Sequence, residues 1–221
     1  MKWLKIVVFL YITITMYADC KNYTKHKRWE QISNQRVFSV SGLVHYKNGF
    51  LIVHDNKRDN QPRISFFKNN KISPLIWPDS SLPYDLEAIS IIPSFKNQYI
   101  LMESTGKCYK IKIEQRNNQI TLMNVFQLET NEGMNLEGCI IVKGNFGYKI
   151  MYGDRGSDLR KSTLFIGDFN PVNNNITNLV KHIIDLPAPS EHKRNIADLG
   201  IDKKNNLFFF NKLLFCSCTK H

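Results

Sequence analysis

Short runs of apolar residues alternate with polar turns along almost the whole chain from about residue 37. The runs are rich in Ile, Val, Phe and Tyr and are bounded by Asn, Gly, Pro or Lys-Asn, which is typical of strands and turns. Residues 109–113, YKIKI, alternate strictly, as a strand with one buried face does. No stretch beyond the leader keeps its apolar residues at a spacing of about 3.6. We therefore expect an all-β protein with almost no helix.

Four passages of the chain resemble one another: residues 41–56, 85–104, 135–154 and 196–211. In each, a small or acidic residue precedes an apolar run, then comes a polar turn, and then a second apolar run. The opening residues align as Gly42, Glu87, Glu137 and Asp198, which are 45, 50 and 61 residues apart. We assign the longest interval to an insertion around NPVNNNITN. Such intervals suit one four-stranded sheet per repeat.

The strand count supports this repeat. The first unit predicts strands at 42–46, 50–54, 63–67 and 73–77, the second at 87–92, 99–103, 108–113 and 120–128, and the third at 138–142, 149–153, 163–169 and 179–186. Repeated four-stranded units predict a β-propeller of antiparallel blades, in which each first strand lines a central channel. The alternative is a β-sandwich, because short strands with turn signals fit that fold too.

The fourth unit ends early, so the sequence predicts an incomplete propeller of about three and a half blades, whereas closed propellers typically have about four to eight. An open ring exposes an apolar edge, which favours self-association. We expect a truncated reading frame; the alternative is a ring completed by another chain. A non-functional fragment is a further possibility, because the tail LFFFNKLLFCSC is apolar and has no acidic residue.

The N-terminus has the pattern of a secretory signal peptide. Two lysines precede an apolar run at 6–14 that is short for a membrane span, so we expect residues 1–18 to be removed and no transmembrane span to remain. Residues 19–36 then form a basic leader, and the domain covers 37–221. These features predict a secreted or periplasmic protein. Cys20 offers a lipoprotein alternative, which Asp19 directly before it disfavours.

Charge and cysteine content add little to this interpretation. The formal charge of +11 becomes +9 without residues 1–18, from 28 basic and 19 acidic residues. The lysines are scattered, and since no nucleic-acid motif accompanies them we expect no nucleic-acid partner. Cys108 and Cys139 lie in predicted strands and fit small buried hydrophobic residues. Cys216 and Cys218 have neither a usual zinc spacing nor a redox spacing.

The repeat resembles the phytase-like ("esterase-like activity of phytase") β-propeller family of bacteria. The resemblance runs from about residue 37 to 208. Its motifs are SGL at 41–43, LIVHDNK at 51–57, DLEAIS at 85–90, ILMESTGKCYKI at 100–111, NLEG at 135–138, YGDRG at 152–156, LFIGDFNP at 164–171 and NIADLGID at 195–202. The resemblance implies an exported six-bladed propeller with a phosphoesterase role. This chain departs from the family because it lacks the last two or so blades.

Acidic residues recur at similar positions of the repeat, namely Glu87, Glu137 and Asp198 on first strands and Asp55, Glu103 and Asp154 after second strands. Converging carboxylates repel one another, and an oxygen-ligated cation such as calcium relieves that repulsion. Such a cation could hold a phosphorylated small molecule, with Arg155 or Lys107 as a positive partner. The alternative is that these acids hold turns by accepting backbone N–H bonds.

The sequence predicts no catalytic residue. His45 and His54 lie at strand positions without a serine or cysteine in a recognisable motif, so they fit structural roles. No Walker loop, Rossmann fingerprint, GxSxG elbow or zinc spacing occurs. A cation-assisted phosphoesterase and a non-catalytic propeller that binds a ligand or partner therefore both remain open.

Overall fold

The computed structural model describes residues 32–157, 159–184, 196–201 and 207–210. The chain divides into two compact units, 1–34 and 35–221, and the fold described below belongs to the second. The predicted signal peptide, the lipoprotein alternative at Cys20 and the cysteines of the tail lie outside the described residues. Within the described part, no helix is long and apolar enough to cross a membrane.

The second unit is all-β, as predicted, apart from the short 3-10 helix η1 (Arg36–Phe38). Sheet 1 contains β1 (Gly42–Tyr46), β2 (Gly49–Val53), β3 (Ile64–Lys68) and β4 (Lys71–Pro74). Sheet 2 contains β5 (Leu86–Ile91), β6 (Gln98–Glu103), β7 (Lys107–Ile113) and β8 (Ile120–Gln127). Sheet 3 contains β9 (Leu136–Gly144), β10 (Gly147–Asp154), β11 (Ser162–Asn170) and β12 (Asn175–Ile184). The last two strands, β13 (Asp198–Ile201) and β14 (Leu207–Phe210), pair with each other.

All four sheets have the same topology. Each is an antiparallel meander in which strands that follow one another in sequence are hydrogen-bonded neighbours. The described strands thus form four separate sheets and not the two facing sheets of a sandwich. Sharp turns join the strands, and asparagines such as Asn69, Asn70 and Asn118 adopt positive φ there, which Asn tolerates better than most residues.

The predicted strands coincide with these elements to within four residues, and the outer strands β4 and β12 are displaced most. The fourth strand of the first unit was expected at 73–77 but lies at Lys71–Pro74, because it pairs tightly with β3 across the turn at Asn69 and Asn70. The insertion expected around NPVNNNITN is absent: residues 171–174 form the β11–β12 turn, and β12 begins at Asn175. The prediction there was wrong because a polar stretch also fits an exposed edge strand.

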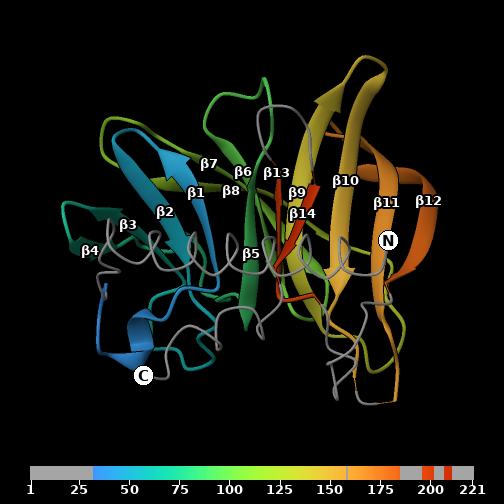
Figure 1. Cartoon of the computed structure of the whole chain (residues 1–221). Helices are drawn as coiled ribbons and strands as arrows, with labels where there is room; N and C mark the ends of the chain where they lie inside the picture. The colour runs from blue at the N-terminus through green and yellow to red at the C-terminus, as the bar shows by residue number, and fades with distance from the viewer. Residues whose placement is uncertain (1–31, 158, 185–195, 202–206, 211–221) are drawn as a thin grey trace, which may run out of the picture. The chain divides into compact units, whose positions relative to one another are not determined.

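The sheets follow one another in space as they do in sequence (Figure 1), and the first strands β1, β5, β9 and β13 are in contact one after the other. One apolar core lies between sheets 1 and 2, a second between sheets 2 and 3, and a third between sheet 3 and β13–β14. The second includes the stacked rings of Tyr152 and Phe165, 4.7 Å apart. Such pairs add about 1 kcal/mol beyond the burial of their surface. Each sheet is therefore stabilised by its neighbours.

Cys108 and Cys139 are free and buried in the core between sheets 2 and 3, which confirms that they act as small buried hydrophobic residues. Burial raises the pKa of both thiols, that of Cys139 to about 12. The thiolate form that reacts with oxidants is therefore scarce in the folded protein.

Candidate functional site

The four first strands line one groove with a volume of about 460 Å³. Its wall is mainly apolar and includes Leu43, Ile89 and Ile140. Of the predicted acids, Asp198 is in the lining, whereas Glu87 and Glu137 are not. Because all four strands run in the same direction along it, the groove has two distinct ends. We call the end where these strands begin the acidic end, and the end where they turn into the second strands the hairpin end.

Glu87 and Glu137 lie at matching positions at the acidic end. Each is the second residue of its strand, β5 or β9, and in both strands the register shifts next to it. Asp198 is the first residue of β13 and directly follows them in the series. Gly138 allows this close approach, because a Cβ there would lie 2.5 Å from the backbone nitrogen of Leu199.

The Glu87 carboxylate lies in an unfavourable environment. Burial, then the charges of Glu137, Asp85 and Asp55, raise its pKa from 4.5 to about 8, and Arg155 opposes this rise. Within the described residues, Glu87 forms no hydrogen bond and no ion pair. A partly buried carboxylate among other carboxylates lacks the compensation that such a charge requires. Among the predicted acids at this end, the charged form of Glu87 is therefore the least stabilised by its surroundings.

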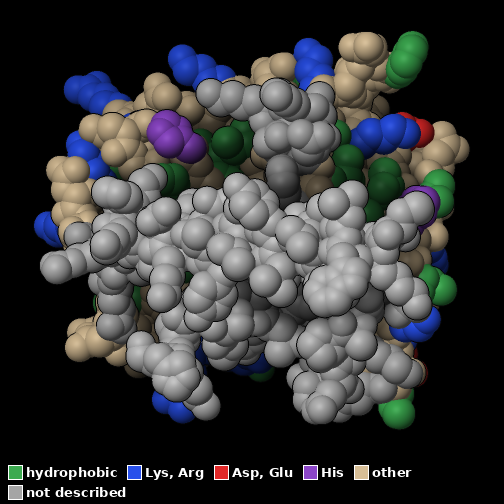
Figure 2. All heavy atoms as spheres, in the orientation of Figure 1, with side chains coloured by type: hydrophobic (Ala, Val, Ile, Leu, Met, Phe, Trp, Pro, Cys, Tyr) green, Lys and Arg blue, Asp and Glu red, His purple; other side chains and the backbone are tan. Residues whose placement is uncertain are grey.

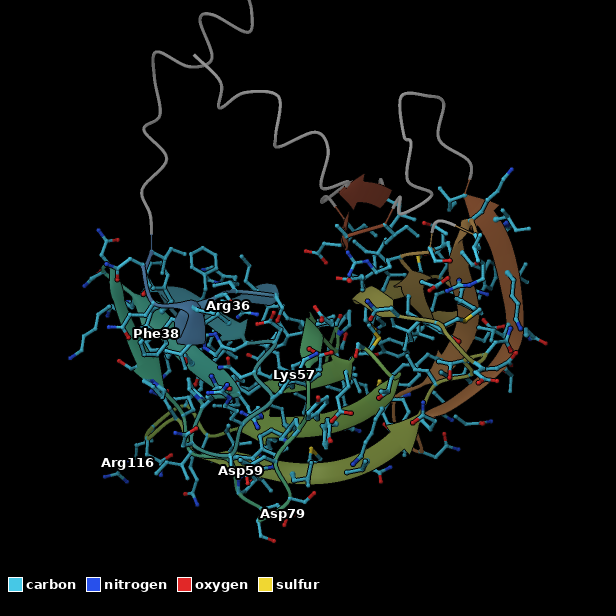
Figure 3. The ribbon with its side chains drawn as sticks, turned by 90° about the horizontal axis from the view of Figure 1, so that it is seen from below. Arg36, Phe38, Lys57, Asp59, Asp79 and Arg116 are labelled. Carbon is cyan, nitrogen blue, oxygen red and sulfur yellow. The ribbon has the colours of Figure 1, made fainter. Side chains whose placement is uncertain are left out.

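The neighbouring acids are compensated by basic residues. Arg155 pairs with Glu137 at 2.9 Å, and Lys57 pairs with Asp85 at the same distance. Figure 3 shows the acidic end, with Lys57 nearer the middle of the array than Asp59. The two acids that most affect Glu87 are therefore each held by a basic residue.

Two of the predicted acids have structural roles. Glu103 is buried and accepts hydrogen bonds from the Tyr84 backbone N–H at 2.7 Å and from the Tyr109 hydroxyl at 2.5 Å. Asp154 is fully buried, accepts from the Asn135 backbone N–H at 3.0 Å and is paired with Arg160. These contacts match the alternative interpretation, in which acids after second strands hold the segment that leads into the first strand.

The other predicted residues, Asp55, Asp198 and Lys107, each contact a different group. Asp55 receives two hydrogen bonds from Arg36, both 2.7 Å, and the Arg36 guanidinium helps to keep the pKa of Asp55 below its usual range despite burial. Asp198 accepts a bond from the Leu199 N–H at 2.7 Å, and burial raises the pKa of Asp198 to about 6. The Lys107 ammonium lies over the Tyr109 ring, 5.2 Å from its centre.

A calcium site built only from protein oxygens needs more ligands than this arrangement supplies. The described residues contain no group of three or more His, Cys, Asp or Glu side chains placed to hold a metal ion, whereas calcium takes about six to eight oxygen ligands. Glu87 and Glu137 fit instead a hydrated divalent cation, which is commonly held by one or two carboxylates together with phosphate oxygens.

A serine–histidine pair was missed at the sequence level. His54 Nε2 lies 2.8 Å from Ser65 Oγ, and its Nδ1 lies 2.8 Å from the Ser39 carbonyl oxygen. Both side chains have 0% exposure, so no substrate reaches them. The pair occupies the place that Glu103 and Tyr109 occupy in sheet 2, which indicates a repeated structural contact. The sequence gives no direct signal for this pair, because the contact depends on the register between β2 and β3.

His45, the other histidine considered, is exposed and makes an edge-to-face contact with Phe50, with ring centres 6.0 Å apart. It forms no hydrogen bond within the described part of the chain.

A scan against protein-family models found no match to this chain. A search of curated proteins also found no match. The resemblance to the phytase-like propellers therefore rests on the sequence motifs and remains a prediction.

Proposed function

We propose that the four sheets are blades of a β-propeller and that its acidic end binds a phosphate ester together with a divalent cation. The repeated meander topology and the successive packing of β1, β5, β9 and β13 support the propeller. The groove between the first strands includes Asp198 but not Glu87 or Glu137, so the proposed site is formed by the starts of these strands and not by the groove itself.

One observation carries the functional proposal: Glu87 and Glu137 lie at matching starts of adjacent strands, and within the described residues Glu87 forms no hydrogen bond and no ion pair, although basic residues nearby attract it. A divalent cation would satisfy this carboxylate and stabilise its charged form. Arg155, which is paired with Glu137, supplies a guanidinium suited to a phosphate oxygen. Magnesium fits two carboxylates plus phosphate oxygens better than calcium, although calcium remains a prediction to be tested.

Binding, rather than hydrolysis, is the part of this proposal that the geometry favours. Hydrolysis requires an activated nucleophile at the ester. The hydroxyl–imidazole pair of Ser65 and His54 is enclosed in the protein and does not reach the groove. A phosphoesterase reaction would therefore depend on water activated next to the carboxylates, and it is the second candidate function.

The test measures the thermal midpoint of the full chain with magnesium or calcium, alone and together with 4-nitrophenyl phosphate. We expect magnesium to raise the midpoint, the ester to raise it further only when the cation is present, and Glu87→Gln combined with Glu137→Gln to abolish both effects. Glu132→Gln is the matched control, because Glu132 is exposed and close to the acidic end. If neither cation acts on the wild type, or if the control loses the response equally, the binding proposal is wrong.

The same samples test hydrolysis. Release of 4-nitrophenol that depends on the cation and is lost in the double variant supports a phosphoesterase. Binding without release supports the non-catalytic alternative. Export to the periplasm or the medium, predicted from residues 1–18, is tested by fractionating cells that express the full chain.

A further inference from the structure

We propose that the hairpin end of the sheets binds the surface of an anionic phospholipid bilayer. This inference concerns the end opposite to the acidic end and does not depend on the proposed function. It rests on the excess of positive charge at the hairpin end and on exposed apolar side chains at two hairpin turns.

The first observation is the distribution of charge. The described residues place eight basic side chains and two acidic ones at the hairpin end. The basic residues are Lys47, Lys68, Lys71, Lys96, Lys112, Arg116, Lys143 and Lys149, and the acidic ones are Glu114 and Asp168. The excess of six positive charges contrasts with the rest of the described residues, where eleven acidic and ten basic side chains nearly cancel. Figure 2 shows lysine and arginine side chains along the hairpin end, at the top of the view.

Most of these basic groups are available to a partner. Lys112 pairs with Glu114 at 3.0 Å and Lys149 with Asp168 at 2.6 Å. The other six form no ion pair within the part of the chain that the structure describes. Lys71 and Lys96 are exposed. Their charges are therefore free to meet phosphate groups, each contributing about 1 kcal/mol near an anionic bilayer.

The second observation is apolar exposure at the turns of sheet 3. Phe146, at the tip of the β9–β10 hairpin between Gly144 and Gly147, is fully exposed, and Val172, in the β11–β12 turn, is 77% exposed. In Figure 1 the β9–β10 hairpin extends beyond its neighbours at this end of the sheets. Neither side chain belongs to any of the three cores. An aromatic ring at such a tip, next to lysines, enters the interfacial region of a bilayer readily.

These features favour a lipid surface over a soluble polyanion such as a nucleic acid. A single-stranded nucleic acid would use positive charge and stack bases on the Phe146 ring, but it offers nothing to an aliphatic side chain on another turn. A bilayer interface accommodates both Phe146 and Val172 while the lysines remain at the level of the headgroups.

The experiment is co-sedimentation of the full chain with vesicles of phosphatidylglycerol and phosphatidylcholine, and with vesicles of phosphatidylcholine alone. All variants retain the leader, so differences between them report on the hairpin end. We expect binding to the anionic vesicles only. Lys71→Gln combined with Lys96→Gln should weaken it about fivefold per lysine, and Phe146→Ser about tenfold. Arg58→Gln combined with Lys161→Gln removes the same charge from the acidic end and should leave binding within twofold.

A second measurement distinguishes insertion of the side chain at position 146 into the bilayer from attraction of the lysines to the headgroups alone. In the variant Phe146→Trp, tryptophan fluorescence should shift to shorter wavelength with anionic vesicles and stay unchanged with free phosphate or with single-stranded DNA. The proposal is overturned by absence of vesicle binding, by equal loss in the control variant, or by Phe146→Ser binding as well as the wild type. Tighter binding to the DNA than to the vesicles would likewise assign this end to a polyanion.

Discussion

Replacing Glu87 by glutamine tests the electrostatic description of the acidic end. The pKa of Glu87 is raised from 4.5 to about 8 in the folded protein. The folded state therefore retains a proton that the unfolded state has released between these two values, and stability falls as the pH rises through this window. Below pH 4.5 both states are protonated and Glu87 has no effect; above pH 8 the destabilisation is complete.

The magnitude follows from the pKa change. Each pKa unit corresponds to about 1.4 kcal/mol, which gives an upper limit of about 5 kcal/mol. Because Glu87 is partly exposed, solvent screening reduces the expected value to about 2 kcal/mol. Glu87→Gln has no charge at either pH, so we expect it to be about 2 kcal/mol more stable than the wild type at pH 8.5 and nearly equal to it at pH 4.5.

Urea unfolding followed by tryptophan fluorescence at these two pH values, without divalent cations, measures the difference. Glu132→Gln is the control, since it removes an exposed carboxylate. Equal stability of the wild type and Glu87→Gln at pH 8.5, with similar urea dependence of the unfolding free energy, would refute the environment assigned to Glu87. It would also remove the main support for the proposed function, while leaving the inference about the hairpin end intact.

Two further substitutions test the packing within and between the sheets. Ser65→Ala should lower the unfolding free energy by about 1–3 kcal/mol, because it leaves buried His54 Nε2 without a partner, and urea unfolding at pH 7.5 measures this loss. Gly138→Ala should cost more than about 2 kcal/mol, because Gly138 has a φ of 57° and an added Cβ would meet the Leu199 backbone. Gly133→Ala is the matched control for backbone strain, with a φ of 75° and open space around it, and should cost about 1 kcal/mol; similar losses in the two glycine variants would contradict the close packing of β9 on β13.

The strand positions could be predicted from the sequence because they depend on local patterns. Alternation of apolar and polar residues, as in 109–113, and Asn-rich turns determine where strands begin and end. The repeat also placed Glu87 and Glu137 at matching points of successive sheets. The prediction was least accurate for the outer strands β4 and β12. These strands carry many exposed residues, so their apolar pattern is weak.

The roles of the acidic residues could not be predicted from the pattern, because each depends on which groups approach from other strands. Glu103 and Glu87 both recur as acids of the repeat, yet Glu103 accepts hydrogen bonds from a backbone N–H and a tyrosine hydroxyl whereas Glu87 has no such partner in the described part. The sequence by itself determined the all-β class, the four-stranded repeat and the recurrence of acids. Only the tertiary structure decided which carboxylates are compensated and which face one another, because electrostatic energy depends on distance and burial, and the packing of separate sheets sets both.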